Sequence, residues 1–210
     1  MANITVDWVR SDPVSIRDYA SAAGFNLNSI DIRELNEGRR SWIEKEVVDW
    51  VISDLDACYA GIKHSKLSDV RQGLYVITFA DNLCINYRDD FSQVIYIGRG
   101  NVRSRIRSHL KNWVLNFSES LQDIRFCFWR AEVRTRGGRK AFKEAEGDFL
   151  NYFFERTGSY PILNKISGSA HQKDHKYSRG SFVPFQKSRG LSSGWALSPM
   201  GDNDWFKPFD

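Results

Sequence analysis

Apolar and polar positions along this chain follow a helical spacing in some segments and alternate in others. Between residues 41 and 62 the apolar side chains recur at helical spacing and acidic ones take the other face, which predicts a long amphipathic helix. Ser41 followed by Glu44 fits a capping box at the start of this helix. Residues 63–70 are polar and predict a linker, so we expect residues 1–70 to form a helical accessory region.

Residues 73–80 alternate well enough to predict a strand, and residues 93–98 predict another. The polar stretch 81–92 between them carries Asp-containing turn signals. Together they predict an antiparallel hairpin with an elaborated loop. Residues 124–133 predict a third strand, and residues 134–140 predict a basic turn.

A helix is predicted from about residue 101 to 116. Arg103, Arg107 and Lys111 are spaced to lie on an outer face of this helix. Arg105 and His109 lie four residues apart on a third face, so their side chains point the same way. The buried stripe of the helix is expected to consist of Val102, Ile106, Leu110, Trp113 and Phe117.

A second long helix is predicted over residues 140–156, and a loop then leads to Asn164. The whole pattern predicts an α+β fold with a small, mainly antiparallel β-sheet flanked by helices, the central domain covering residues 71–167. Residues 168–210 form a basic and aromatic tail that we expect to dock on this domain, because aromatic residues are scattered along it, among them Trp195, Trp205, Phe206 and Phe209.

Charge is distributed unevenly over these three regions. Residues 1–70 carry 8 basic and 12 acidic residues (−4), residues 71–166 carry 16 and 10 (+6), and residues 167–210 carry 6 and 4 (+2). The basic excess therefore lies in the central domain, where a polyanion is expected to bind. Chance unevenness among solvated charges is the alternative.

The composition favours a folded protein of the cytoplasm. With 210 residues, 41% of them hydrophobic and 14% aromatic, the chain is long enough for a well-packed core. No apolar run approaches the roughly 20 residues of a membrane span, and the N-terminal residues do not resemble a secretory signal. Cys58, Cys84 and Cys127 form no Cys-x-x-Cys pair and are expected to be reduced.

One carboxylate lies where an apolar residue is expected. Glu146 is at the centre of the stripe formed by Phe142, Phe149, Leu150 and Phe153 on the second helix. A carboxylate in apolar surroundings is costly unless it is paired or binds a metal. Glu146 is therefore a candidate metal ligand, and a half-buried salt bridge to an arginine is the alternative.

Other polar residues supply the rest of a possible site. Arg105 suits a phosphate because its planar fork donates two parallel hydrogen bonds. His109 is placed to accept a proton or to orient a hydroxyl. Tyr75 and Tyr96 lie on strands near Gly73 and Gly98, whose missing side chains allow close approach. For each residue alone the plainer alternatives are a solvated charge, a structural histidine and packed tyrosines.

Taken together, these residues resemble the GIY-YIG nuclease family. The family's two tripeptides appear as Gly73-Leu74-Tyr75, with leucine for isoleucine, and as Tyr96-Ile97-Gly98. Its arginine matches Arg105, its metal-binding glutamate matches Glu146, and its terminal asparagine matches Asn164. The resemblance covers about residues 71–167, with residues 81–92 as a long departure within the hairpin.

The resemblance implies a divalent-metal-dependent endonuclease that hydrolyses phosphodiester bonds of double-stranded DNA, with one Mg²⁺ or Mn²⁺ per site. Tyr75, helped by His109, would take a proton from water, although Tyr96 is an open alternative for this role. Arg105 would stabilise the phosphate charge, Glu146 would hold the metal, and Asn164 would support the site. Basic residues are expected to contact DNA, namely Arg99, Arg103, Arg107, Lys111, Arg134, Arg136, Arg139 and Lys140.

Within the family, the short extensions and the Arg-x-x-x-His pair look similar to the type II restriction enzymes. That similarity implies sequence-specific cleavage by a homodimer on DNA. A defence or repair nuclease of the same family is one alternative. A catalytically silent nucleic-acid-binding module is another, because the basic helix would serve it equally well.

Overall fold

A computed structural model describes residues 3–25, 36–63, 65–80, 83–115, 124–135, 141–165, 175–186 and 196–197 of the chain. Its helices and helical turns are α1 (Ile16–Ala22), α2 (Glu37–Lys63), η2 (Leu67–Asp69), α3 (Val102–His109), η3 (Leu110–Val114), α5 (Ala141–Thr157) and η4 (Arg179–Phe185). Its strands are β1 (Asn3–Arg10), β2 (Val14–Ser15), β3 (Gly73–Phe79), β4 (Cys84–Asn86), β5 (Phe91–Ser92), β6 (Val94–Gly100), β7 (Arg125–Thr135), β8 (Lys176–Tyr177) and β9 (Ala196–Leu197).

The main sheet has the strand order β6-β3-β7-β1-β8, with β2 paired to one end of β7. Its long strands are antiparallel to their neighbours, and only the short β8 runs parallel to β1. The expected hairpin of 73–80 with 93–98 is present as β3 and β6, and the third expected strand is β7. The predicted mainly antiparallel sheet flanked by helices is confirmed.

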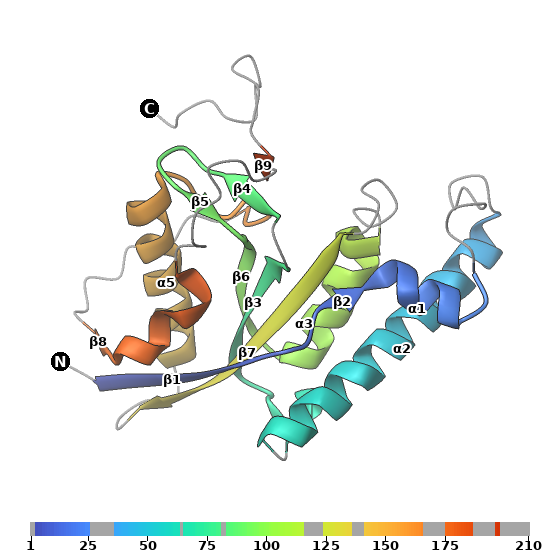
Figure 1. The fold of residues 1–210 in the computed structure, drawn as a ribbon. Helices are drawn as coiled ribbons and strands as arrows, with labels where there is room; N and C mark the ends of the chain where they lie inside the picture. Colours follow the sequence, from blue (N-terminus) through green and yellow to red (C-terminus); the bar gives the residue numbers. More distant parts are fainter. Residues whose placement is uncertain are drawn as a thin grey trace.

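Helices cover both faces of the sheet, as Figure 1 shows with α5 on one side and α2 and α3 on the other. The side chains alternate accordingly. On one face the hydroxyl of Tyr59 in α2 donates to the carbonyl of Phe128 in β7 at 2.5 Å. On the other face Trp8 of β1 packs against Phe149 of α5 with 5.9 Å between ring centroids. The core is therefore continuous through the sheet rather than confined to one layer.

The expectation of a helical region over residues 1–70 is wrong at its start. Residues 3–10 form β1, which pairs with β7 from Ile4 opposite Thr135 to Arg10 opposite Trp129. The sheet therefore crosses the expected boundary at residue 70. Ile4, Val6 and the partly buried Trp8 share one face of this strand, a period-two pattern too short to stand out beside the long helix.

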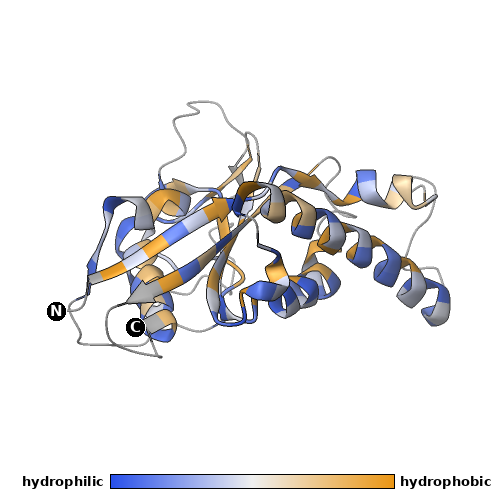
Figure 2. Ribbon diagram, turned by 90° about the horizontal axis from the view of Figure 1, so that it is seen from below, coloured by the Kyte–Doolittle hydropathy of each residue, from blue (hydrophilic) through white to orange (hydrophobic). Residues whose placement is uncertain are grey.

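Helix α2 also begins earlier than the capping box predicted. The side chain of Asn36 accepts a hydrogen bond from the backbone N–H of Arg39 at 2.9 Å, which is the bond of an N-cap residue. The helix therefore starts at Glu37, before Ser41. Figure 2 shows hydrophobic residues recurring among hydrophilic ones along the long helices, as expected for helices with one buried face.

The predicted helix 101–116 changes its geometry after His109. Asn101 caps α3 by accepting from the backbone N–H of Ser104 at 3.0 Å, and residues 110–114 then form a π-helical turn, η3. Val114 is fully buried, whereas Trp113 is only partly buried, so the expected stripe is shifted at its end. Phe117 lies outside the described residues.

The described part of the tail packs on the domain. Residues 175–186 contain β8, which pairs with β1, and η4, whose Phe185 lies 5.1 Å from Phe149 between ring centroids. The strand β9 pairs with β4 in a separate three-stranded sheet. The four aromatic residues that suggested docking, Trp195, Trp205, Phe206 and Phe209, lie outside the described residues.

Cys58, Cys84 and Cys127 form no disulfide, and Cys84 and Cys127 are buried. Over the described ranges, no helix is both long and apolar enough to cross a membrane.

Candidate active site

The two tyrosines of the tripeptides stack on each other across β3 and β6. Their ring centroids are 5.8 Å apart and their planes are inclined by 17°. Gly98 makes this possible, because a Cβ at that position would overlap the hydroxyl of Tyr75 and the ring of Tyr96. The glycine of the second tripeptide is thus needed for the tyrosines to meet.

Arg105 binds both tyrosine hydroxyls from the first turns of α3. Its Nε donates to the oxygen of Tyr75 at 3.2 Å, and its Nη2 donates to that of Tyr96 at 3.4 Å. Arg105 is an exposed residue, so the rest of its guanidinium reaches solvent. The face shared by Arg105 and His109 is therefore the face that meets the tyrosines.

His109 lies against the same hydroxyl. Its Nε2 is 2.9 Å from the oxygen of Tyr75, and its ring centroid is 4.2 Å from that of Tyr96. Burial, followed by the charge of Arg105, lowers the pKa of His109 to about 4. The imidazole is therefore neutral at neutral pH.

Tyr75 is fully buried, while Tyr96 is partly exposed. Burial raises the pKa of Tyr75 far above its ordinary value, and Tyr96 raises it further, while Arg105 lowers it. Since burial outweighs the arginine, the phenol of Tyr75 keeps its proton at neutral pH in this structure. The two tyrosines thus differ in access to solvent, and the choice of base between them stays open.

Glu146 lies on α5 and forms an ion pair with Arg99 of β6. Its Oε2 is 2.7 Å from Nε of Arg99, and its side chain is 20% exposed. Burial raises the pKa of Glu146, while the charges of Arg99 and of Arg105 lower it. The carboxylate therefore lies within electrostatic reach of the tyrosine–arginine cluster. The half-buried salt bridge, the alternative to metal binding, is present in this structure.

Asn164 binds the middle residue of the second tripeptide. Its side-chain oxygen accepts from the N–H of Ile97 at 2.9 Å, and its side-chain nitrogen donates to the carbonyl of Ile97 at 2.7 Å. Because β6 is the edge strand, these outward backbone groups lack a strand partner, and the amide replaces one. Asn164 therefore supports the strand of Tyr96.

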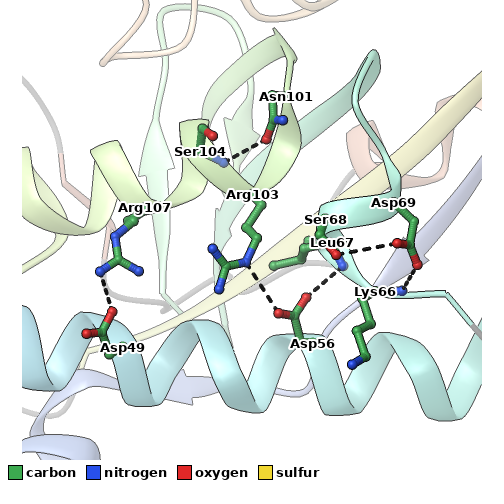
Figure 3. A network of polar contacts seen from close by, with 10 residues as sticks. All are labelled: Asp49, Asp56, Lys66, Leu67, Ser68, Asp69, Asn101, Arg103, Ser104 and Arg107. Carbon is green, nitrogen blue, oxygen red and sulfur yellow. Dashed lines mark hydrogen bonds and ion pairs between the residues drawn. The ribbon is translucent and has the colours of Figure 1, made fainter.

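The expected outer face of α3 is not an outer face. Figure 3 shows Arg103 and Arg107 directed at the acidic helix α2, where they pair with Asp56 and Asp49. The Arg103 Nε to Asp56 Oδ2 distance is 3.4 Å. The prediction that these two arginines point outward is wrong, since the sequence pattern does not show that α2 packs against this side of α3. Of the three expected residues, Lys111 alone is exposed in the manner predicted.

Of the remaining residues expected to contact DNA, Arg99 lies within the described residues. Arg99 is engaged with Glu146. The side chain of Arg134 and all of Arg136, Arg139 and Lys140 lie outside the described residues. The basic turn predicted at residues 134–140 begins too early, because β7 extends to Thr135, and residues 136–140 stay a prediction from sequence.

Trp113 is a site residue that the sequence analysis assigned to the core. Its indole Nε1 donates to Nδ1 of His109 at 2.8 Å. The signal was available, because Trp113 is four residues after His109 just as His109 is four residues after Arg105. Aromatic residues at such spacing are usually packed in the core, which is why the stripe was assigned to packing.

Metal ligands are sparse around this cluster. Among the described residues there is no group of three or more His, Cys, Asp or Glu side chains placed to hold a metal ion. A magnesium ion is often held by one or two carboxylates, with water and substrate phosphate completing its shell. Glu146 fits that pattern as a single carboxylate. A metal ion bound there would displace Arg99 from the carboxylate or bind the same carboxylate together with Arg99.

Comparisons with known proteins found no family model, no curated protein and no solved structure that matches this chain.

Proposed function

We propose that this protein is a divalent-metal-dependent endonuclease that hydrolyses phosphodiester bonds of double-stranded DNA. The observation that carries the proposal is the cluster in which Arg105 and His109 both contact the hydroxyl of Tyr75, with Tyr96 stacked beside it. Glu146 lies near enough for the charge of Arg105 to act on it. A cation, ionisable hydroxyls and a carboxylate are the groups that phosphodiester hydrolysis requires.

Arg105 binds the scissile phosphate in this proposal. One edge of its guanidinium is held by the tyrosines, which fixes its orientation, and the remainder reaches solvent. A preoriented donor stabilises the charge that develops on the phosphate without reorganisation during the reaction. The tyrosines therefore position the guanidinium of Arg105.

The tyrosine pair receives the proton of the attacking water. Water adds to phosphorus, its proton passes to a tyrosine oxygen, and the bond from phosphorus to the leaving oxygen breaks as that oxygen takes a proton from solvent. Arg105 and His109 both contact the oxygen of Tyr75 and favour its phenolate, whereas burial opposes it. The phenol must first release its own proton to solvent, and added positive charge at the site favours that release.

Glu146 would hold the divalent cation, Mg²⁺ or Mn²⁺, which supplies Lewis-acid stabilisation of the leaving oxygen when bound. Arg99 orients the carboxylate and favours its ionised form, against the burial that raises the pKa of Glu146. Asn164 holds β6, so that Tyr96 and Arg99 keep their places on that strand.

Sequence-specific cleavage as a type II restriction enzyme is the form of this activity that we propose. A site with a single carboxylate suits one strand at a time, so a double-strand cut at a palindromic site calls for two copies related by a two-fold axis. The protein is therefore proposed to act as a homodimer on DNA, within the cytoplasm.

The decisive test incubates purified protein with plasmid DNA, with and without Mg²⁺. Discrete fragments are expected for the wild type, and Glu146→Gln should abolish cleavage while DNA affinity in a gel shift is retained. Glu144→Gln, two positions away on α5, is the matched control and should still cleave. If the control is inactive and Glu146→Gln cleaves, the carboxylate assignment is wrong.

A catalytically silent DNA-binding module is the second candidate, and the Arg99–Glu146 ion pair favours it. A carboxylate already paired with an arginine at 2.7 Å has a structural role without any metal. Intact plasmid together with a gel shift, for the wild type and for Glu146→Gln alike, would support this candidate.

A further inference from the structure

The side chain of His109 is held from two sides. Tyr75 lies at its Nε2, 2.9 Å away, and the indole of Trp113 lies at its Nδ1, 2.8 Å away. An indole N–H is a donor and never an acceptor. Nδ1 of His109 must therefore be the unprotonated, accepting nitrogen.

We infer that Trp113 is a positioning residue that fixes His109 in its Nε2–H tautomer, so that His109 donates a hydrogen bond to Tyr75 and does not take the proton of Tyr75. The tautomer follows because a neutral imidazole carries one proton, and Nδ1 is occupied as an acceptor. Nε2–H then points at the oxygen of Tyr75. The expected effect on DNA cleavage rests on the proposed function, whereas the tautomer follows from the hydrogen bonds alone.

The consequence for Tyr75 is that its oxygen accepts two N–H donors. One is Nε2–H of His109, and the other is Nε–H of Arg105 at 3.2 Å. Hydrogen bonds donated to an oxygen stabilise its anionic form. His109 therefore acts on the phenolate as a donor, in place of the proton acceptor that the sequence analysis considered.

The neutral state of His109 supports this assignment. Burial and the nearby charge of Arg105 lower its pKa to about 4, so a second ring proton is absent at neutral pH. Trp113 also lies in the π-helical turn η3 that follows α3. Such turns are rare and are frequently found at functional sites.

The experiment measures the tautomer of His109 directly by nitrogen NMR of histidine-labelled, full-length protein, with His109→Gln identifying the signal. The wild type should show Nε2–H at neutral pH. Trp113→Phe keeps an aromatic ring and removes the donor, so it should lose the exclusive Nε2–H state. Trp129→Phe, whose indole donates to Thr78 on β3 at 3.4 Å, is the matched control and should leave the tautomer unchanged.

Activity is the second readout. Trp113→Phe should lower the cleavage rate by about threefold to tenfold, the worth of one hydrogen bond, at unchanged DNA affinity. A wild type with Nδ1–H or a doubly protonated ring overturns the inference, as does a Trp113→Phe protein that keeps the Nε2–H tautomer. If Trp113→Phe fails to fold, the wild-type tautomer alone decides. A wild type that never cleaves DNA but shows Nε2–H refutes the proposed function and leaves the tautomer assignment standing.

Discussion

Arg105 and Arg107 lie two residues apart on one helix and meet opposite surroundings. Arg105 faces the tyrosines of the sheet, with its donors on two neutral hydroxyls and its remainder in solvent. Arg107 faces α2, where its charge is matched by Asp49. The first arrangement leaves positive charge available for an anion, whereas the second consumes it within the protein.

The same contrast extends to their neighbours. On the site side, His109 and Trp113 continue the chain of contacts from Tyr75. On the α2 side, Arg103 binds Asp56, which also accepts the N–H of Leu67 in the linker. One helix therefore organises a candidate catalytic cluster on one face and joins the N-terminal region to the domain on another.

Replacing Arg105 by alanine gives the largest expected separation of the two faces. The cleavage rate should fall by about a hundredfold to a thousandfold, as for the loss of one preorganised donor to a developing anion. Arg103→Ala and Arg107→Ala are the matched controls and should retain rates close to wild type in the same plasmid assay. Equal losses for all three arginines would remove the distinction between the faces.

The next comparison removes one tyrosine hydroxyl from the candidate site, at Tyr75, and one from α2, at Tyr59. Tyr75→Phe should lower the cleavage rate by about a hundredfold, the size expected for lost general base catalysis, with little effect on folding. Tyr59 is a buried residue of α2 whose hydroxyl donates to the carbonyl of Phe128, so Tyr59→Phe should lower the free energy of unfolding by about 0.5–1.5 kcal/mol without affecting the rate. Rates and chemical denaturation of both variants check this.

A further variant, Tyr96→Phe, decides which tyrosine is the base. If Tyr96→Phe is inactive and Tyr75→Phe cleaves normally, the partly exposed tyrosine accepts the proton and Tyr75 positions Arg105.

A smaller effect is expected from the ion pairs between α3 and α2. Arg103→Ala and Arg107→Ala should each lower the free energy of unfolding by about 0.5–1 kcal/mol, because both pairs are partly solvent-exposed. Lys111→Ala, at an exposed position of η3, is the control. Urea denaturation of the three variants should rank Lys111→Ala as the least destabilised.

The smallest expected effect is the pH dependence of the Asp49 pair. Burial raises the pKa of Asp49, but hydrogen bonds from Arg107 and Lys45 outweigh it and leave the pKa below its ordinary value. A carboxyl whose pKa is lower in the folded state contributes stability above its unfolded pKa, and loses it as the pH falls through the folded pKa. Asp49→Asn should therefore be less stable than the wild type at neutral pH, and this difference should vanish in acid.

Much of the architecture follows from local pattern. The apolar runs at residues 73–80 and 93–98 identified β3 and β6, and β3 is buried along its whole length. The apolar stripe around Glu146 identified α5, because helical spacing places those residues on one face. The i, i+4 spacing of Arg105 and His109 also identified two residues that meet the same hydroxyl. The strand β1 was missed, since its alternation is short and gives a weak signal beside a long helix.

The sequence by itself determined which residues share a helix face or a strand face, and it singled out Glu146 as a carboxylate among apolar neighbours. The tertiary structure decided what each face meets. Packing of α2 against α3 made Arg103 and Arg107 structural partners, and the docking of α5 brought Arg99 to Glu146. The physical reason is that periodicity fixes a side chain's direction within its own element, while its charge partner comes from an element distant in the chain.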